Sequence, residues 1–257
     1  MLALKWKKQR RINLNNVTAI ILAAGRGTRM QSTDTNKVAM KVHGEPLLSR
    51  SIRILRSSGI SSIVVVVGFA KDSVIALLDQ DILVAEQKEQ LGTGHAVSCA
   101  IPFVPDTSHH LLIMNGDDSY LYTPEIFQSF YDTHVSRGAK ITLITMDSDN
   151  PTGFGRIVRD KNQEIVGIVE EKNATDEQKE IQEINLGCYI IDKKYLEENI
   201  KDIKKNVVSG EFYITDIIDI ISHHHGKIAG YKLTHGRWQG VNTREDLEEA
   251  ENILSNE

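Results

Sequence analysis

The first place in this chain where chemistry is expected is an apolar run that ends in a glycine- and arginine-rich segment. Residues 17–24 are almost entirely apolar, as in a strand that is buried on both faces of a parallel sheet. Gly25 and Gly27 allow the backbone to approach a ligand closely, and Arg26 and Arg29 supply permanently charged donors that suit phosphate oxygens. Such a segment at the carboxyl end of a parallel strand predicts a phosphate-binding loop.

The spacing within this loop excludes two common phosphate-binding motifs. The dinucleotide fingerprint requires a third glycine where Met30 stands, and the nucleotide-triphosphatase loop requires Gly-Lys-Ser/Thr at residues 30–32, which are Met-Gln-Ser. For Gly-x-Gly alone, a tight turn that carries solvated arginines is the preferred interpretation. The longer run from Leu22 to Met30, Leu-Ala-Ala-Gly-x-Gly-Thr-Arg-Met, resembles the signature of the sugar-nucleotide pyrophosphorylases.

This resemblance implies roles for the loop and for a lysine that follows it. It assigns nucleotide binding to Leu22, Ala23, Ala24, Gly25 and Gly27. Arg29 would hold the β- and γ-phosphates, and Lys37 would contact the reacting phosphates. The family's Leu-Pro-Lys is replaced here by Thr35-Asn36-Lys37, with one residue inserted before it. A mobile surface lysine is therefore an equal alternative for Lys37.

A metal site is expected at the carboxyl end of another apolar strand. Asp117 follows the apolar residues 111–114 and would face the ligand crevice, where its carboxylate suits Mg²⁺; a turn aspartate is the alternative. In the family resembled, the Asn of Gly-Val-Asn shares the metal with the strand-tip Asp, and that residue is Asn242 here. Asn242 could instead cap the helix of residues 244–254, a task that Thr243 could also perform.

A glutamine- and glycine-rich segment is expected to contact the base. Residues 87–96 resemble the family's Gln-x-x-Gln-Leu-Gly-Thr-Gly stretch, in which a glutamine and a glycine backbone contact uracil. The resemblance assigns nucleotide binding to Gln87, Gln90, Gly92 and Thr93. An amide offers a donor and an acceptor to a base edge, and by flipping it also satisfies cytosine or thymine. The alternative is a glycine-rich loop in which Thr93 caps the following helix.

The sugar side of the site has the most extensive resemblance. Four segments run in register with the bacterial N-acetylglucosamine-1-phosphate uridylyltransferases: residues 153–159, 168–170, 173–178 and 181–185. The resemblance places the acetamido sugar against Gly155, Glu170 and Asn185, with Tyr213 and Thr215 nearby. Acceptors and an amide are reasonable partners for sugar hydroxyls.

Three departures from the family pattern bear on these expectations. The usual Gly-Asp-x-Pro is Gly-Asp-Asp-Ser at residues 116–119, so Asp118 could assist the metal or face solvent. Asn115 stands where some relatives have an aromatic residue, which leaves the sugar open. The bifunctional bacterial enzyme continues into a left-handed β-helix that acetylates glucosamine 1-phosphate and builds a trimer. This chain stops at Glu257, so we expect neither that activity nor that assembly surface.

The order of the elements predicts how these residues are brought together. Strands and helices alternate from residue 17 to residue 146, which predicts an α/β, Rossmann-like fold with a mostly parallel central sheet flanked by helices. From Gly153 a hairpin and a further strand predict a smaller antiparallel, sugar-binding lobe. We expect residues 1–16 to be a basic, flexible N-terminal extension and residues 17–257 to form one nucleotidyltransferase domain.

Composition limits the class of protein. The chain has 257 residues, 40% hydrophobic content and a net charge of −5, which argues against binding nucleic acid through bulk charge. No apolar run approaches the roughly 20 residues that span a bilayer, and nothing resembles a signal peptide. Cys99 and Cys188 are expected to be reduced core residues. These features predict a cytoplasmic protein.

Together, the resemblance predicts a Mg²⁺-dependent enzyme that condenses UTP with N-acetylglucosamine 1-phosphate to UDP-N-acetylglucosamine and pyrophosphate. Its partners would be small-molecule substrates, with no nucleic acid and no membrane, and the oligomeric state is open. One alternative is a pyrophosphorylase for another sugar or base, such as dTTP with glucose 1-phosphate. Another is a sugar-nucleotide sensor without catalytic activity.

Overall fold

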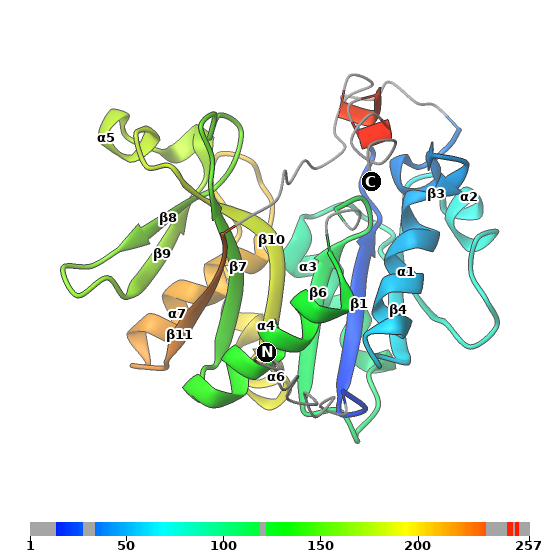
Figure 1. Cartoon of the computed structure of the whole chain (residues 1–257), viewed down its shortest axis with the longest axis horizontal. Helices are drawn as coiled ribbons and strands as arrows, with labels where there is room; N and C mark the ends of the chain where they lie inside the picture. The colour runs from blue at the N-terminus through cyan, green and yellow to red at the C-terminus, as the bar shows by residue number, and fades with distance from the viewer. Residues whose placement is uncertain (1–13, 28–33, 119–121, 235–245, 249, 252–257) are drawn as a thin grey trace, which may run out of the picture.

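A nine-stranded mixed sheet forms the centre of the computed structural model, which describes residues 14–27, 34–118, 122–234, 246–248 and 250–251 (Figure 1). The strand order is β11-β7-β10-β6-β1-β4-β5, with β8 paired to β10 and β9 paired to β8. The bounds of these strands are β1 Val17–Ala23, β4 Ser62–Val67, β5 Leu83–Glu86, β6 His110–Asn115, β7 Ile141–Asp147, β8 Arg156–Arg159, β9 Ile165–Val169, β10 Glu183–Asp192 and β11 Ile228–Leu233. Two short strands, β2 Lys41–Val42 and β3 Glu45–Pro46, form a separate hairpin.

The parallel part of the sheet explains the apolar runs of the sequence. β1 pairs in parallel with β4 on one side and β6 on the other, and β4 pairs in parallel with β5. Ile20 and Ile21 point to opposite faces of β1, and both side chains are fully buried. Because parallel strands end at a common edge, the segments that follow β1, β4 and β6 emerge together.

Helices cover both faces of this sheet (Figure 1). Leu55 of α1 and Phe130 of α4 belong to one core cluster, whereas Val97 of α3 and Ile218 of α7 belong to a second one. The helices are α1 Leu47–Ser57, α2 Lys71–Ile75, α3 Thr93–Ala100, α4 Pro124–Arg137, α5 Asp176–Lys179, α6 Lys193–Asn199 and α7 Ile217–His223. The predicted fold class, a mostly parallel sheet between helices, is confirmed.

The expected antiparallel lobe is present, but it is continuous with the main sheet. β8 and β9 form an antiparallel hairpin, and β8 also pairs with β10 through Arg156 and Ile184. β10 in turn runs antiparallel between β6 and β7. In Figure 1 this hairpin and α5 lie at the opposite end of the molecule from β4. A single long strand, β10, therefore connects the lobe to the strand that ends at Asn115.

Some local expectations need correction. α2 is short and ends at Ile75, because the backbone N–H groups of Leu77 and Leu78 donate to carbonyls three residues earlier and not to those four residues earlier. Cys188 is buried, as predicted, but Cys99 is only partly buried on α3. Leu14 is 1% exposed, so the core includes a residue before β1. No helix in the described ranges is both long and apolar enough to cross a membrane.

Candidate active site

The segment that follows β1 is held in place by the segment that follows β4 and by the side-chain amide of Asn36. Ala24 is buried, and its carbonyl accepts a hydrogen bond of 3.0 Å from the backbone N–H of Phe69. Gly68 is closely packed here, because a Cβ on it would lie 2.8 Å from the same carbonyl. Gly27 has a φ of +55°, which favours glycine. Arg29 lies outside the described residues, so its predicted phosphate contact stays a prediction.

Lys37 and Asp117 are brought together at the edge where β1 and β6 end. The Lys37 ammonium forms an ion pair with the Asp117 carboxylate, and the two side chains are only 16% and 9% exposed. Gly116 donates its N–H to the carbonyl of Leu22 at 3.0 Å, which fixes the turn that presents Asp117. The alternative of a mobile surface lysine is therefore wrong for Lys37. Asp117 lies in a turn, as its alternative had it, but this turn aspartate is buried and paired with a cation.

Asp118 lies beside this ion pair and is buried, so the expectation that it could face solvent is wrong. Its Oδ2 accepts a hydrogen bond of 2.6 Å from the amide of Asn115. Burial, and then the negative charge of Asp117, raise the pKa of Asp118 to about 8. Two departures from the family pattern, at positions 115 and 118, are thus one hydrogen-bonded pair.

The site offers part of a magnesium-binding set. Asp117 supplies a hard carboxylate oxygen that already faces a cation, and Mg²⁺ typically takes one or two protein carboxylates besides phosphate oxygens and water. Within the described ranges, no group of three or more His, Cys, Asp or Glu side chains is arranged to hold a metal by itself. Asn242, the second predicted ligand, lies outside those ranges.

The glutamine-rich segment packs against the segment that precedes α7. Gln87 is buried directly after β5, and its amide donates to the Gly92 carbonyl at 3.0 Å. Gly92 has a φ of +99°, and a Cβ there would lie 2.5 Å from the Phe212 carbonyl oxygen. The backbone N–H of Phe212 donates in return to the Leu91 carbonyl at 2.8 Å. The Gln90 amide lies 3.5 Å from the Gln87 carbonyl.

Thr93 has a different role from the helix cap considered above. α3 begins at Thr93, the N-cap position is Gly92, and no side chain caps the helix there. The Thr93 hydroxyl instead accepts a hydrogen bond of 3.0 Å from the backbone N–H of Ile214. Thr93 therefore joins the expected base-binding segment to the turn that contains Thr215.

The three residues predicted to hold the sugar meet at the junction of β8, β9 and β10. A Cβ added to Gly155 would lie 3.6 Å from Oε1 of Glu170 and 3.7 Å from Cβ of Asn185. The backbone N–H of Asn185 donates to the Gly155 carbonyl at 2.8 Å, and the Asn185 amide donates to the Tyr189 hydroxyl at 2.6 Å. Since Gly155 has no side chain, the Glu170 carboxylate stays accessible from this side.

A pocket of about 350 Å³ opens next to Glu170. It is lined by Gly153, Glu170, Glu171, Lys172, Glu211 and Tyr213. Burial raises the pKa of Glu170, an effect that the Lys172 charge opposes. The Lys172 ammonium donates to the Tyr213 hydroxyl at 2.5 Å. Thr215 lies one turn further along the chain and is not among the lining residues.

Sequence reasoning assigned no role to two buried side chains near the site. Asn36 is 1% exposed beside Lys37, and Arg156 is 1% exposed beside Gly155. Arg156 forms an ion pair of 2.7 Å with Glu171, which lines the pocket. The sequence signal for Arg156 was its place directly after Gly155, the glycine predicted to contact the sugar. The sequence signal for Asn36 was that it replaces the proline of the family's Leu-Pro-Lys.

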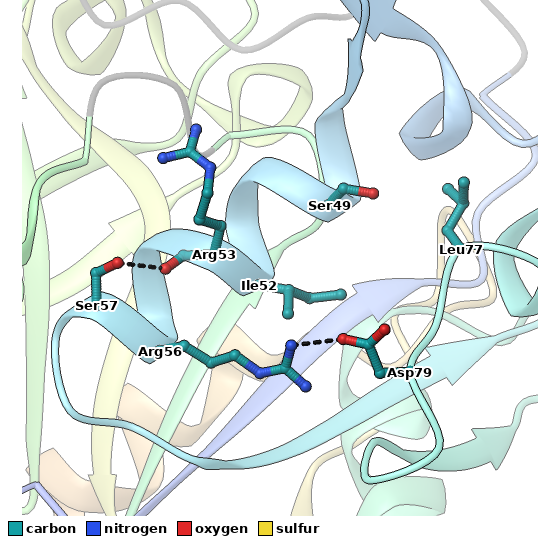
Figure 2. Close-up of a pocket in the computed structure, with 7 residues that line it drawn as sticks. All are labelled: Ser49, Ile52, Arg53, Arg56, Ser57, Leu77 and Asp79. Carbon is teal, nitrogen blue, oxygen red and sulfur yellow. Dashed lines mark hydrogen bonds and ion pairs between the residues drawn. The ribbon is translucent and has the colours of Figure 1, made fainter.

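A larger pocket, of about 490 Å³, lies between α1 and the segment that follows α2, and none of the predicted site residues lines it (Figure 2). Arg53 and Arg56 are among its lining residues, but both are paired with carboxylates. Arg53 bonds to Glu45 at 2.8 Å, and Arg56 bonds to Asp79 at 2.5 Å. Because these arginines are paired and substantially exposed, this pocket lacks the buried, converging groups of the β1–β6 edge.

The sequence of this chain is similar to the sequences of known proteins. The model of the family described as nucleotidyl transferase matches residues 18–257. The chain is 40% identical over 237 residues to the bifunctional protein GlmU of Geobacillus sp. (strain WCH70), which covers 92% of this chain and 51% of that protein. It is 37% identical over 241 residues to the GlmU of Caldanaerobacter subterraneus subsp. tengcongensis, which covers 94% of this chain and 52% of that protein. The chain thus spans about half the length of these relatives.

A solved structure shares the fold. It is that of a putative glucose-1-phosphate thymidylyltransferase from Bacillus anthracis in complex with a sucrose. The TM-score is 0.78 at 22% sequence identity, with 94% of this chain and 96% of that chain covered. The segment matched by the family model, residues 18–257, includes the segment after β1, the turn after β6 that contains Asp117, and the β8–β9 hairpin. The chain belongs to the nucleotidyl transferase family.

Proposed function

We propose that this nucleotidyl transferase condenses UTP with a sugar 1-phosphate, N-acetylglucosamine 1-phosphate, to give UDP-N-acetylglucosamine and pyrophosphate. The observation that supports this most directly is the closeness of the two half-sites. Asn115, two residues before Asp117, lies 2.8 Å from the position that a Cβ of Gly187 would take. The backbone N–H of Gly187 donates to Asn185 Oδ1 at 3.1 Å. A few contacts therefore separate the Lys37–Asp117 pair from the sugar-side asparagine.

The reaction needs no nucleophile from the protein. A phosphate oxygen of the sugar 1-phosphate attacks the α-phosphorus of UTP in line, and the bond from the α-phosphorus to the bridging oxygen breaks. Pyrophosphate leaves with that electron pair. The sugar phosphate is already ionised near neutral pH, so the protein contributes positioning and charge neutralisation.

The roles of individual residues follow from their positions. Lys37 lies at the edge where the phosphates would bind and balances their negative charge. Leu22, Ala23, Ala24, Gly25 and Gly27 present the nucleotide loop, and Arg29 holds the β- and γ-phosphates. Gln87, Gln90, Gly92 and Thr93 form the base side.

The sugar is held by Gly155, Glu170 and Asn185, with Tyr213 and Thr215 at the rim. Glu170 suits a hydroxyl group, because its carboxylate has no hydrogen-bond partner among the residues that the structure describes. Three carboxylates line the adjacent pocket, which favours a neutral sugar over an anionic one. Mg²⁺, held by Asp117 and Asn242, would supply positive charge that neutralises phosphate oxygens.

Two other functions remain as outcomes of one experiment. The first is the same reaction with another pair, such as dTTP and glucose 1-phosphate, since an amide at Gln87 can serve several bases. The second is a sugar-nucleotide sensor. The buried Lys37–Asp117 pair favours catalysis over sensing, because a protein that only binds has no need for a buried charge pair at the reacting phosphates.

Pyrophosphate release by the purified protein with Mg²⁺, UTP and N-acetylglucosamine 1-phosphate tests the proposal. We expect release that stops on addition of EDTA and that falls strongly in Asp117→Ala. A matched control is Asp106→Ala, a change at an exposed carboxylate that is paired with Lys193 far from the site. Release with a different nucleotide or sugar would select the first alternative. Nucleotide binding without release from any pair would select the sensor.

A further inference from the structure

Asn36 is buried between the segments that surround the nucleotide loop, and the proposed reaction assigns it no role. Its side-chain amide nitrogen lies within hydrogen-bond distance of three backbone carbonyls: Ala23 at 3.0 Å, Gly25 at 3.1 Å and Phe69 at 2.9 Å. Its side-chain oxygen accepts from the backbone N–H of Val38 at 3.2 Å. One short side chain thus contacts the segments after β1 and β4 and the 3₁₀ turn that begins at Lys37.

The partners of Asn36 determine the direction of its amide group. Three carbonyl oxygens surround the nitrogen and require a donor, whereas the backbone N–H of Val38 requires an acceptor. Two amide hydrogens serve three acceptors, so one of them is shared. Asparagine is the smallest side chain that supplies two donor hydrogens on one atom and an acceptor on another. Aspartate has the same shape, but it would place an acceptor against three carbonyls.

The backbone of Asn36 connects the same network to Lys37. Asn36 is the N-cap of the turn over Lys37–Ala39, and its own N–H donates to the Ser73 hydroxyl at 2.9 Å. A Cβ added to Gly27 would lie 3.2 Å from the Cβ of Lys37, so the loop backbone also packs on the lysine stem. Moving Asn36 would therefore displace the loop and the Lys37–Asp117 pair together.

We infer that Asn36 is a positioning residue that couples the backbone of the nucleotide loop to the placement of the Lys37 ammonium group. This inference rests on the proposed function, because it assumes that the loop and Lys37 act on the same nucleotide. Asn36 is 1% exposed, so we expect it to act on the substrate only through the loop and Lys37. It sets the distance between the groups that would hold the triphosphate, and displacements of about 1 Å in such groups can cost 10²-fold in rate.

Asn36→Ala and Asn36→Asp test the inference through the kinetic parameters of the two substrates. We expect both to lower kcat/KM for UTP by about 10²-fold, with a change of no more than about threefold in KM for the sugar 1-phosphate. The control is Asn199→Ala, which removes an asparagine that is also buried and that bonds to the Tyr195 carbonyl at 2.8 Å in α6. We expect this control to lower the melting temperature and to leave the ratio of the KM values for the two substrates unchanged.

A double-mutant cycle with Lys37→Ala separates positioning from general stability. If Asn36 acts through Lys37, Asn36→Ala should cost much less in kcat when Lys37 is already absent. Additive effects of the two substitutions would overturn the coupling, and so would an equal rise in KM for both substrates. If Asn36→Asp matched the wild type, the requirement for a donor would be wrong. If the wild-type protein had no activity, the proposed function would be refuted. The structural part of the inference could still be tested, because a loop that depends on Asn36 should show faster amide hydrogen exchange at residues 23–27 in Asn36→Ala.

Discussion

The ammonium group of Lys37 and the carboxylate of Asp117 form an ion pair that is largely shielded from water. Lys37 comes from the turn after the nucleotide loop, and Asp117 from the turn after β6. The pair therefore joins two segments that lie 80 residues apart in the sequence. A charge that is buried with its partner is costly to leave alone, because the low-dielectric surroundings cannot solvate it.

Lys37→Ala should consequently reduce stability as well as activity. We expect the free energy of unfolding to fall by about 3 kcal/mol, the usual range for a buried pair that loses one member, and pyrophosphate release to fall by at least about 10²-fold. Urea unfolding and initial rates measure the two effects. The control is Lys71→Ala, because the Lys71–Glu86 pair of 2.8 Å is exposed and its loss should change the free energy of unfolding far less than the loss of the buried pair. Equal losses in the two variants would contradict the buried character of the Lys37–Asp117 pair.

Much of this fold could be predicted from local sequence patterns. The apolar runs of β1, β4 and β6 have a composition that only a doubly covered strand explains, and all three are central strands. The sugar-side residues Gly155 and Asn185 were found by their resemblance to a family motif, and the structure brings them within contact distance of each other.

Other parts of the site depend on contacts that no local pattern contains. Thr93 stands at the start of a helix, where threonine often serves as a cap. Its hydroxyl instead accepts a hydrogen bond from the backbone N–H of Ile214, which lies 121 residues away. The burial of Asn36 depends on distant carbonyls that accept from its amide. Buried Arg156 pairs with a distant carboxylate, but its Nε has no hydrogen-bond partner among the described residues. Sequence alone gives the residue type at such positions, but not the partners that determine its role.

The contact between Gly92 and Phe212 predicts a sharp intolerance of side chains at residue 92. Gly92→Ala would place a Cβ 2.5 Å from the Phe212 carbonyl oxygen, at a φ of +99°. We expect a loss of about 2–4 kcal/mol in unfolding free energy from this clash and strain, together with a higher KM for UTP. Thermal and urea unfolding would measure the first effect.

Gly138→Ala is the matched control for Gly92→Ala. Gly138 also has a positive φ, +58°, at the end of α4, but a Cβ there would meet nothing within 4 Å. Its cost should therefore be limited to backbone strain, about 1 kcal/mol, with no change in KM for UTP. A Gly92 variant no worse than this control would show that the segments can separate without penalty.

A histidine pair, formed by buried His134 and partly buried His110, predicts loss of stability in mild acid. His134 Nδ1 bonds to the Thr142 hydroxyl at 2.8 Å, and its Nε2 lies 3.2 Å from Nδ1 of His110. Burial, and then the nearby His110, lower the pKa of His134 from 6.5 to about 4, although Asp192 opposes this effect. The folded state thus binds fewer protons than the unfolded state between pH 6.5 and 4, and its stability must fall across that window.

The contribution of His134 should lower the free energy of unfolding by about 2–3 kcal/mol at pH 4, since one pKa unit corresponds to about 1.36 kcal/mol. Urea unfolding measured from pH 7.5 to 4 would detect it; His134→Gln should flatten the acid limb, although it lowers stability at neutral pH. His223→Gln, at the exposed end of α7, should keep the wild-type slope. An unaltered acid limb in His134→Gln would assign the acid sensitivity to other groups.

Arg156 connects the loop that precedes β8 to the wall of the pocket beside Glu170, where we propose that the sugar binds. Its guanidinium donates to the Phe154 carbonyl and bonds to the Glu171 carboxylate at 2.7 Å. The same carboxylate accepts the N–H of Gly153 at 3.2 Å. Because Gly153 and Glu171 both line the pocket, Arg156 fixes the pocket wall from behind.

Arg156→Lys keeps the positive charge but loses the planar pair of donors that reaches the Phe154 carbonyl and the Glu171 carboxylate together. We expect KM for the sugar 1-phosphate to rise by about tenfold while KM for UTP stays nearly constant, since only the sugar-side wall is loosened. The control is Arg159→Lys in the same hairpin. Arg159 pairs with Glu183 at 2.7 Å, and neither of these residues lines the pocket. If the two lysine variants raised KM for the sugar phosphate equally, the effect would belong to the hairpin as a whole and not to the Arg156–Glu171 contact.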